Sequence, residues 1–154
     1  GFSLGDLDTG VVRNPSSNQA LVVNTAGVVT GLDLDGLTVA FQQNVGAATS
    51  WPFPVGTGFI VSLASGAVER WTPSGRMWTT PITNPTGVNL EYNAQVAYVG
   101  STDGKLHQLS LATGADQLQL DLGDDGVGTP SIDVASGRIH VGTLGGHVCA
   151  LPIP

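Results

Sequence analysis

The stretch Val96–Leu109, VAYVGSTDGKLHQL, holds an apolar run, a polar turn that ends in Gly104, and a second run of alternating apolar residues. Alternation with a period of two indicates β-strands, and glycine supplies the backbone conformation that a tight turn between strands needs. The stretch therefore predicts a β-hairpin. Three further stretches share the pattern, and their turn glycines are Gly27, Gly66 and Gly146.

The four turn glycines recur at intervals of about 39, 38 and 42 residues. A second turn follows the first three of them, at Asp35-Gly36, Ser74-Gly75 and Thr113-Gly114. Further strands are predicted before and after each hairpin, so each repeat reads as four short strands. Four antiparallel strands in a repeat of about 40 residues are the pattern of a propeller blade. The sequence predicts an all-β fold, a β-propeller of about four such blades.

The repeats set the expected organisation of the domain. Residues 1–154 form one propeller domain, with repeats at about 11–46, 47–85, 86–124 and 125–154, and with 1–10 as the end of a blade's outer strand. A blade that stands between two neighbours is buried on both faces. Two sets of equivalent third-strand positions are therefore expected in the core: Val29, Val68, Leu106 and Val148 in one set, and Leu32, Trp71, Leu109 and Leu151 in the other.

The last repeat lacks a fourth strand of its own. Leu4-Gly5-Asp6 matches Leu122-Gly123-Asp124, so the N-terminal segment is the candidate to supply that strand. An unpaired strand edge attracts other strands and has to be covered. Three arrangements would cover it: a closed four-blade ring, half of an eight-blade ring made by two chains, or a fragment of a longer propeller. The predicted assembly or ring-closure edge consists of Gly1, Phe2, Ser3, Leu4 and Gly5.

The composition disfavours some classes of partner and location. Five Lys and Arg residues against twelve Asp and Glu residues give a net charge of −7, which disfavours nucleic acid and anionic membranes as partners. No apolar stretch approaches the roughly 20 residues of a membrane-spanning helix, and no signal-peptide pattern begins at Gly1. The single cysteine, Cys149, can form no disulfide within the chain. Few charges and many small polar residues favour an extracytoplasmic location, either periplasmic, on the cell surface or secreted.

Residues 96–114, VAYVGSTDGKLHQLSLATG, together with Gly128–Asp133 and Arg138–Gly142, resemble PQQ-like (quinoprotein-type) β-propeller repeats, a class of repeat akin to WD40 and YVTN propellers. The family includes eight-bladed dehydrogenases that hold the quinone over calcium. It also includes non-catalytic members such as the lipoprotein propeller of the outer-membrane barrel-assembly machine. The tryptophan that follows the Thr-Gly turn in enzyme blades is Phe41 or Leu118 in two repeats here, and the adjacent-cysteine pair is absent. No catalytic, cofactor-binding or metal-binding residue is assigned.

Two aromatic residues are candidates for binding a ligand, Trp51 and Trp78. Trp51 lies between a serine and a proline, which favours an exposed position. The histidines His107, His140 and His147 are interpreted as ordinary strand or rim residues. The acidic loop Asp121–Asp125 is interpreted as a solvated turn.

The sequence predicts a non-catalytic scaffold or protein-interaction module in a cell-surface, periplasmic or extracellular assembly. Its partner would be another protein or a further copy of itself, held at the open blade edge. Two alternatives stay open. The chain is part of a PQQ-dependent dehydrogenase, completed by another chain and loaded with PQQ and calcium, or it is a carbohydrate-binding propeller that uses Trp51 or Trp78.

Overall fold

The structure is a computed structural model that describes residues 3–7, 10–90, 95–123 and 125–154. The regular elements in these ranges are β-strands, arranged in four antiparallel sheets. Sheet 1 consists of β1 (Val12–Asn14), β2 (Gln19–Val23), β3 (Val28–Asp33) and β4 (Thr38–Asn44). Sheet 2 consists of β5 (Phe53–Val55), β6 (Gly58–Leu63), β7 (Ala67–Thr72) and β8 (Gly75–Pro81).

Sheet 3 consists of β9 (Pro85–Leu90), β10 (Val96–Ser101), β11 (Lys105–Ser110) and β12 (Asp116–Asp121). Sheet 4 consists of β13 (Ser131–Asp133), β14 (Arg138–Gly142) and β15 (Val148–Pro152). In each sheet the strands lie in chain order, so every repeat is a simple antiparallel meander. The predicted blade of four strands is confirmed in sheets 1 to 3, and sheet 4 has three strands among the described residues.

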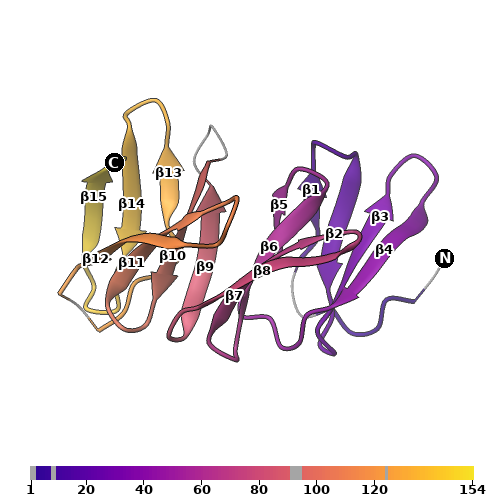
Figure 1. Cartoon of the computed structure of the whole chain (residues 1–154), viewed down its shortest axis with the longest axis horizontal. Coiled ribbons are helices and arrows are strands. Elements are labelled where there is room, and N and C mark those ends of the chain that lie inside the picture. Colours follow the sequence, from indigo (N-terminus) through magenta and orange to yellow (C-terminus); the bar gives the residue numbers. More distant parts are fainter. Residues whose placement is uncertain (1–2, 8–9, 91–94, 124) are drawn as a thin grey trace.

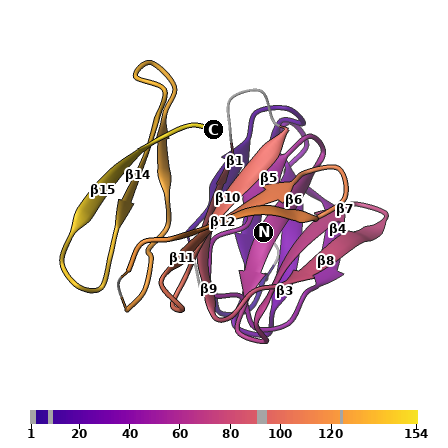
Figure 2. The same ribbon diagram turned by 60° about the vertical axis from the view of Figure 1, so that its left-hand side comes forward.

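The four sheets stand side by side in chain order and form an open arc, with the two chain ends at opposite ends of it (Figure 1). Turning the molecule shows that β14 and β15 stand apart at one end (Figure 2). The first strands of neighbouring sheets converge, since β1 contacts β5 and β9 contacts β13. These first strands therefore form the inner side of the arc.

Apolar side chains fill the space between each pair of neighbouring sheets. One cluster lies between sheets 1 and 2, a second between sheets 2 and 3, and a third between sheets 3 and 4. Strand β6 contributes to two of them, because Phe59 and Val61 face sheet 1 while Ile60 faces sheet 3. All six residues of β6 are buried. The expectation that a blade buries both of its faces is confirmed here.

The predicted first turns are confirmed by the backbone. Gly27, Gly66, Gly104 and Gly146 have φ angles of 76°, 81°, 86° and 82°, a region that favours glycine. The second turn of sheet 1 differs from the expectation, because its positive φ of 50° falls on Leu37 and not on Gly36. The carboxylate of Asp33 accepts hydrogen bonds from the N–H groups of Asp35 and Gly36, which holds the start of this turn in place.

In the second predicted core set Leu109 is buried, while Leu32, Trp71 and Leu151 are half-buried. In the first set, one predicted core position is wrong. Val29 and Val68 are fully buried and Leu106 is 4% exposed, but the equivalent Val148 is 80% exposed. Val29, Val68 and Leu106 each belong to the cluster between their own sheet and the next one. Sheet 4 has no following sheet among the residues that the structure describes, so nothing covers Val148.

The described part of the chain has no helix whose length and hydropathy would let it cross a bilayer.

Candidate functional site

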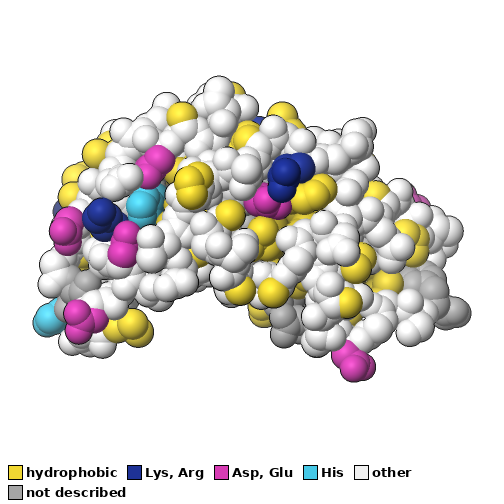
Figure 3. All heavy atoms as spheres, turned by 60° about the horizontal axis from the view of Figure 1, so that its bottom comes forward, with side chains coloured by type: hydrophobic (Ala, Val, Ile, Leu, Met, Phe, Trp, Pro, Cys, Tyr) yellow, Lys and Arg dark blue, Asp and Glu magenta, His cyan; other side chains and the backbone are white. Residues whose placement is uncertain are grey.

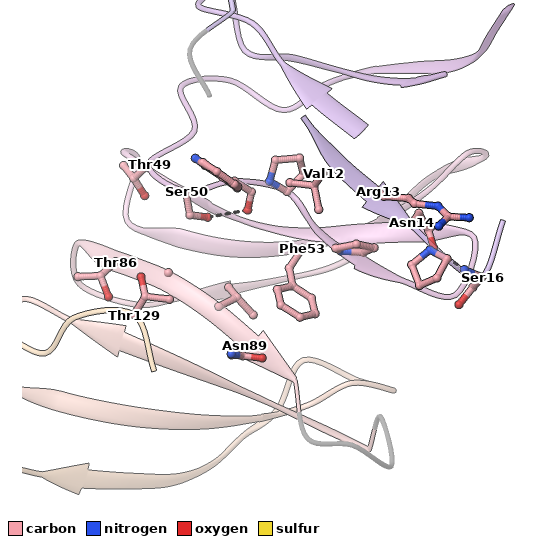
Figure 4. Close-up of a pocket in the computed structure, with 16 residues that line it drawn as sticks. Val12, Arg13, Asn14, Ser16, Thr49, Ser50, Phe53, Thr86, Asn89 and Thr129 are labelled. Carbon is pink, nitrogen blue, oxygen red and sulfur yellow. Dashed lines mark hydrogen bonds between the residues drawn. The ribbon is translucent and has the colours of Figure 1, made fainter. Parts of the chain in front are cut away.

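A groove of about 790 Å³ runs along the inner side of the arc. Its walls come from β1, β5 and β9 and from the loop that enters β5, so it extends over sheets 1 to 3. Figure 4 shows Phe53 near the middle, with Arg13 and Ser16 at one end and Thr86 and Thr129 at the other. The volume falls within the range of small-ligand sites, about 300–1,000 Å³.

Polar side chains along the groove tie each sheet to the next. Four of them donate a hydrogen bond to a backbone carbonyl of the following sheet or of the loop that leads into it. The distances are 2.9 Å for Asn14 to Gly56, 3.0 Å for Thr49 to Pro85, 3.0 Å for Thr86 to Val127 and 3.2 Å for Asn89 to Pro130. Because these donors are already engaged, their first role is to hold the arc together.

Two side chains in the groove are open to solvent and carry chemistry that a ligand can use. Trp51 is 59% exposed, and its ring lies over the backbone of Gly10, where an added Cβ would stand 3.2 Å from the indole. Arg13 is exposed on β1 and is the one charged residue among the described residues that line the groove. The arrangement therefore offers an aromatic platform and a cation.

The far end of sheet 4 forms a second distinctive surface, which we call the open end. Strand β15 pairs with β14 on one side, and no other described strand pairs with it. The equivalent third strands β3, β7 and β11 each have a fourth strand on their other side. The edge of β15 therefore presents unpaired backbone groups.

Two leucines on β12 extend the open end. Leu118 is 41% exposed and Leu120 is 38% exposed, while Trp78 and Thr80 at the equivalent positions of β8 are buried. Trp78 is covered by Leu111 and Gly114 of sheet 3. Among the described residues, no such cover lies over Leu118 and Leu120, and both side chains stay more than a third exposed.

The structure does not bring the N-terminal segment to the open end. Gly1 and Phe2 lie outside the described residues. Asn24 donates a hydrogen bond of 2.9 Å to the Leu4 carbonyl, and the N–H of Thr25 donates one of 2.8 Å to the Asp6 carbonyl, so this segment lies against sheet 1. Since the two chain ends are at opposite ends of the arc (Figure 1), the four sheets do not close into a ring in this structure.

No protein-family model matches this sequence, and no curated protein is significantly similar to it. Solved structures do match, among them the crystal structure of BamB from Moraxella catarrhalis. That structure superposes with a TM-score of 0.76 at 18% sequence identity, and the match covers 97% of this chain and 49% of the BamB chain. The fold is a β-propeller. This propeller chain spans about half the length of the structure that it matches.

The structure places Trp78 in the core of the propeller. Its side chain is 8% exposed, it packs in the cluster between sheets 2 and 3, and its Nε1 donates a hydrogen bond of 2.9 Å to the Leu111 carbonyl. A side chain covered in this way offers no face to a ligand. The expectation that Trp78 binds a ligand is therefore corrected, and Trp51 is the tryptophan that is open to solvent.

Sequence reasoning did not find the pair that the buried His107 forms with Asp116. Nδ1 of His107 lies 2.9 Å from Oδ2 of Asp116, and Nε2 lies 4.0 Å from Oδ1 of Asp103. Gln119 donates a second hydrogen bond to Asp116. Within the described ranges, no group of three or more His, Cys, Asp or Glu side chains is placed to hold a metal ion. On the face in Figure 3 the Lys and Arg side chains stand beside acidic side chains and do not gather into a basic patch.

One carboxyl group has a clearly shifted pKa. The hydroxyl and backbone N–H of Ser136 donate hydrogen bonds to Asp133 and lower the pKa of its carboxyl below 3.8. Asp133 ends β13, and the bonds close the turn into β14. Cys149 is a free, half-buried thiol that packs against the cluster between sheets 3 and 4.

Proposed function

We propose that this chain is a non-catalytic, extracytoplasmic propeller scaffold that binds a protein partner at the open end of sheet 4. The repeats resemble PQQ-like propellers, a class with non-catalytic members. The small share of charged residues and the scarcity of lysine favour a location outside the cytoplasm. The observation that carries the proposal is Val148, which is 80% exposed at a position that every other sheet buries.

Three features make the open end suited to a propeller partner. Its edge strand β15 lacks a neighbour on one side among the described strands, and Leu118 and Leu120 line a shallow apolar hollow together with Leu151 of β15. The face of sheet 4 that would pack against a following sheet is exposed at Val148. A further set of propeller sheets would satisfy all three, because it supplies both a strand for the edge and a sheet for the face.

The partner that we propose is a second copy of this chain. The match covers nearly all of this chain and about half of the BamB chain, so two arcs of this size would make a ring of that length. The predicted edge segment, Gly1, Phe2, Ser3, Leu4 and Gly5, would then belong to the copy that faces β15. The described part of this segment, Ser3–Gly5, lies at the opposite end of the arc, as such head-to-tail closure requires.

The mass in solution tests this proposal. We expect light scattering to show a dimer that dissociates on dilution, and we expect Leu118→Lys with Leu120→Lys to give monomers of unchanged secondary structure. Met77→Lys, which places the same charge on an exposed position of β8, is the control and keeps the dimer. A wild-type chain that stays monomeric at high concentration, or a double variant that still dimerises, would contradict the proposal.

The alternative of a quinone enzyme finds little support in the inner groove. Calcium prefers several oxygen ligands, with carboxylates prominent among them. None of the described residues that line the groove is Asp or Glu, and the side chains of Thr49, Thr86 and Asn89 are engaged in inter-sheet hydrogen bonds. The residues present therefore do not fit PQQ with calcium. The carbohydrate alternative rests on Trp51 alone.

A further inference from the structure

The inner groove has a lining that differs from the rest of this acidic chain. Trp51 and Phe53 supply aromatic surface, and Val12 and Val88 add aliphatic surface. The chain carries twelve acidic residues, yet none of them is among the described lining residues, and Arg13 is the charged group there. Charge complementarity favours a ligand that is mostly apolar and carries a negative group near Arg13.

The polar side chains of the groove do not suit a sugar. A carbohydrate presents many hydroxyl groups, and each one that is buried without a partner costs free energy. Thr49, Thr86 and Asn89 already donate to backbone carbonyls of neighbouring sheets. The Ser50 hydroxyl donates to the Trp51 carbonyl and also accepts from the N–H of Ser62. Few donors are left for a dense set of hydroxyls.

The inner strands are also unsuited to adding a strand from a partner. A proline stands in or beside the first strand of every sheet: Pro15 follows β1, Pro54 lies in β5, Pro85 begins β9 and Pro130 precedes β13. Proline has no N–H to donate, and prolines on an edge strand prevent further strand pairing. A polypeptide in this groove therefore docks through side chains and ring surfaces.

We propose that the inner groove binds an extended, proline-containing polypeptide segment that carries an acidic side chain opposite Arg13. A polyproline II segment needs no ladder of backbone hydrogen bonds and is already ordered, so an aromatic groove binds it at low entropic cost. Trp51 and Phe53 are the platforms for its proline rings. This site lies on the inner side of sheets 1 to 3, away from the open end, so either proposal can fail while the other holds.

Titration with a defined peptide tests the proposal. The probe is an acetylated, amidated peptide of prolines and leucines with one central glutamate. Three further ligands are compared with it: the same peptide with lysine in place of glutamate, a glycine-serine peptide with one glutamate, and a linear glucose hexasaccharide. Calorimetry measures binding, and tryptophan fluorescence reports on Trp51, the exposed indole. We expect saturable binding of the glutamate peptide, weaker binding of the lysine peptide, and none of the other two.

Variants separate the aromatic and ionic contributions. We expect Trp51→Ala to weaken binding by about tenfold or more and Trp51→Phe to keep most of it, since the ring provides the surface. Arg13→Gln should remove the difference between the glutamate and lysine peptides, and added salt should reduce that difference in the wild type. Met77→Ala and Arg138→Gln, both exposed and away from the groove, are the controls and bind as the wild type does.

Four results would overturn the proposal. These are no saturable binding of the glutamate peptide, equal binding of the glycine-serine peptide, preferred binding of the hexasaccharide, and unchanged affinity in a folded Trp51→Ala protein. Thermal unfolding checks that each variant is folded. The oligomeric state is measured in the same samples, so loss of peptide binding is distinguished from failure of assembly at the open end.

Discussion

The ring of Phe41 lies against the backbone of Gly31, its cross-strand partner in sheet 1, where an added Cβ would overlap the ring. The same ring stacks on Phe59 of sheet 2 at 6.2 Å between centroids, and Phe59 stacks on Trp71 at 6.5 Å. Because Gly31 has no side chain, the Phe41 ring can pack directly against its backbone. This contact also places the first of three rings that join sheets 1 and 2.

Replacing Gly31 by alanine is expected to destabilise the chain by about 1–3 kcal/mol, because the new methyl group displaces the ring from a packed position. Urea unfolding measures the change. Gly142→Ala is the matched control, since it lies in β14 with open space around it and is expected to change stability by less than about 0.5 kcal/mol. Equal effects at both positions would contradict the packing role of Gly31.

The buried pair of His107 and Asp116 should behave as a coupled unit. Removing either partner leaves the other without its 2.9 Å contact in a largely buried place, and each single alanine variant is expected to cost about 1–3 kcal/mol. The double variant should cost less than the sum by about 0.5–3 kcal/mol. His107→Ala combined with Asp35→Ala, in an exposed turn of sheet 1, is the control, and the two changes in unfolding free energy should add. If the changes for His107→Ala and Asp116→Ala also add, the pair is not coupled.

Asn14 is expected to hold sheets 1 and 2 together at the inner edge. It is fully buried, its amide donates to the Gly56 carbonyl, and its Oδ1 accepts from the N–H of Ser16 at 3.0 Å. Asn14→Ala should cost about 1–3 kcal/mol, because it removes both hydrogen bonds of this fully buried side chain. Faster hydrogen exchange at Ser16 would accompany the loss. Ser17→Ala serves as the nearby control, and a change no larger than its own would argue against the tie.

The repeat was predictable from the sequence because its turns depend on local chemistry. The four hairpin glycines have the expected positive φ angles, and the strands that follow them lie where alternation predicted them. The second turn of sheet 1 was not predictable in detail, since the side chain of Asp33 caps it and moves the positive φ to Leu37. Val148 was misassigned because equivalence between repeats presumes a following sheet.

The candidate sites were less predictable because they depend on contacts between sheets. The exposed position of Trp51 followed from the prolines that come after it, Pro52 and Pro54, but the groove around it exists only where β1, β5 and β9 converge. The histidine pair depends on an irregularity in the pairing of β11 with β12. The register shifts between Gln108 and Leu109, so Asp116 pairs with Leu109 while His107 pairs with Gln119. A sequence gives no local sign of such a shift.

The turn between β13 and β14 is expected to lose stability in acid. The pKa of Asp133 is lower in the folded chain than its ordinary value of 3.8, because Ser136 donates hydrogen bonds to the ionised carboxylate. A carboxyl whose pKa is lower in the folded chain than in the unfolded chain stabilises the fold at pH values above its unfolded pKa. That contribution disappears as the pH falls through its folded pKa.

We therefore expect Ser136→Ala to raise the pKa of Asp133 toward 3.8 in an NMR titration and to reduce the acid dependence of unfolding. Asp133→Asn should remove the same dependence, while Asp35→Asn, in the exposed turn between β3 and β4, keeps it. An unchanged Asp133 titration in the Ser136 variant would show that another group sets this pKa.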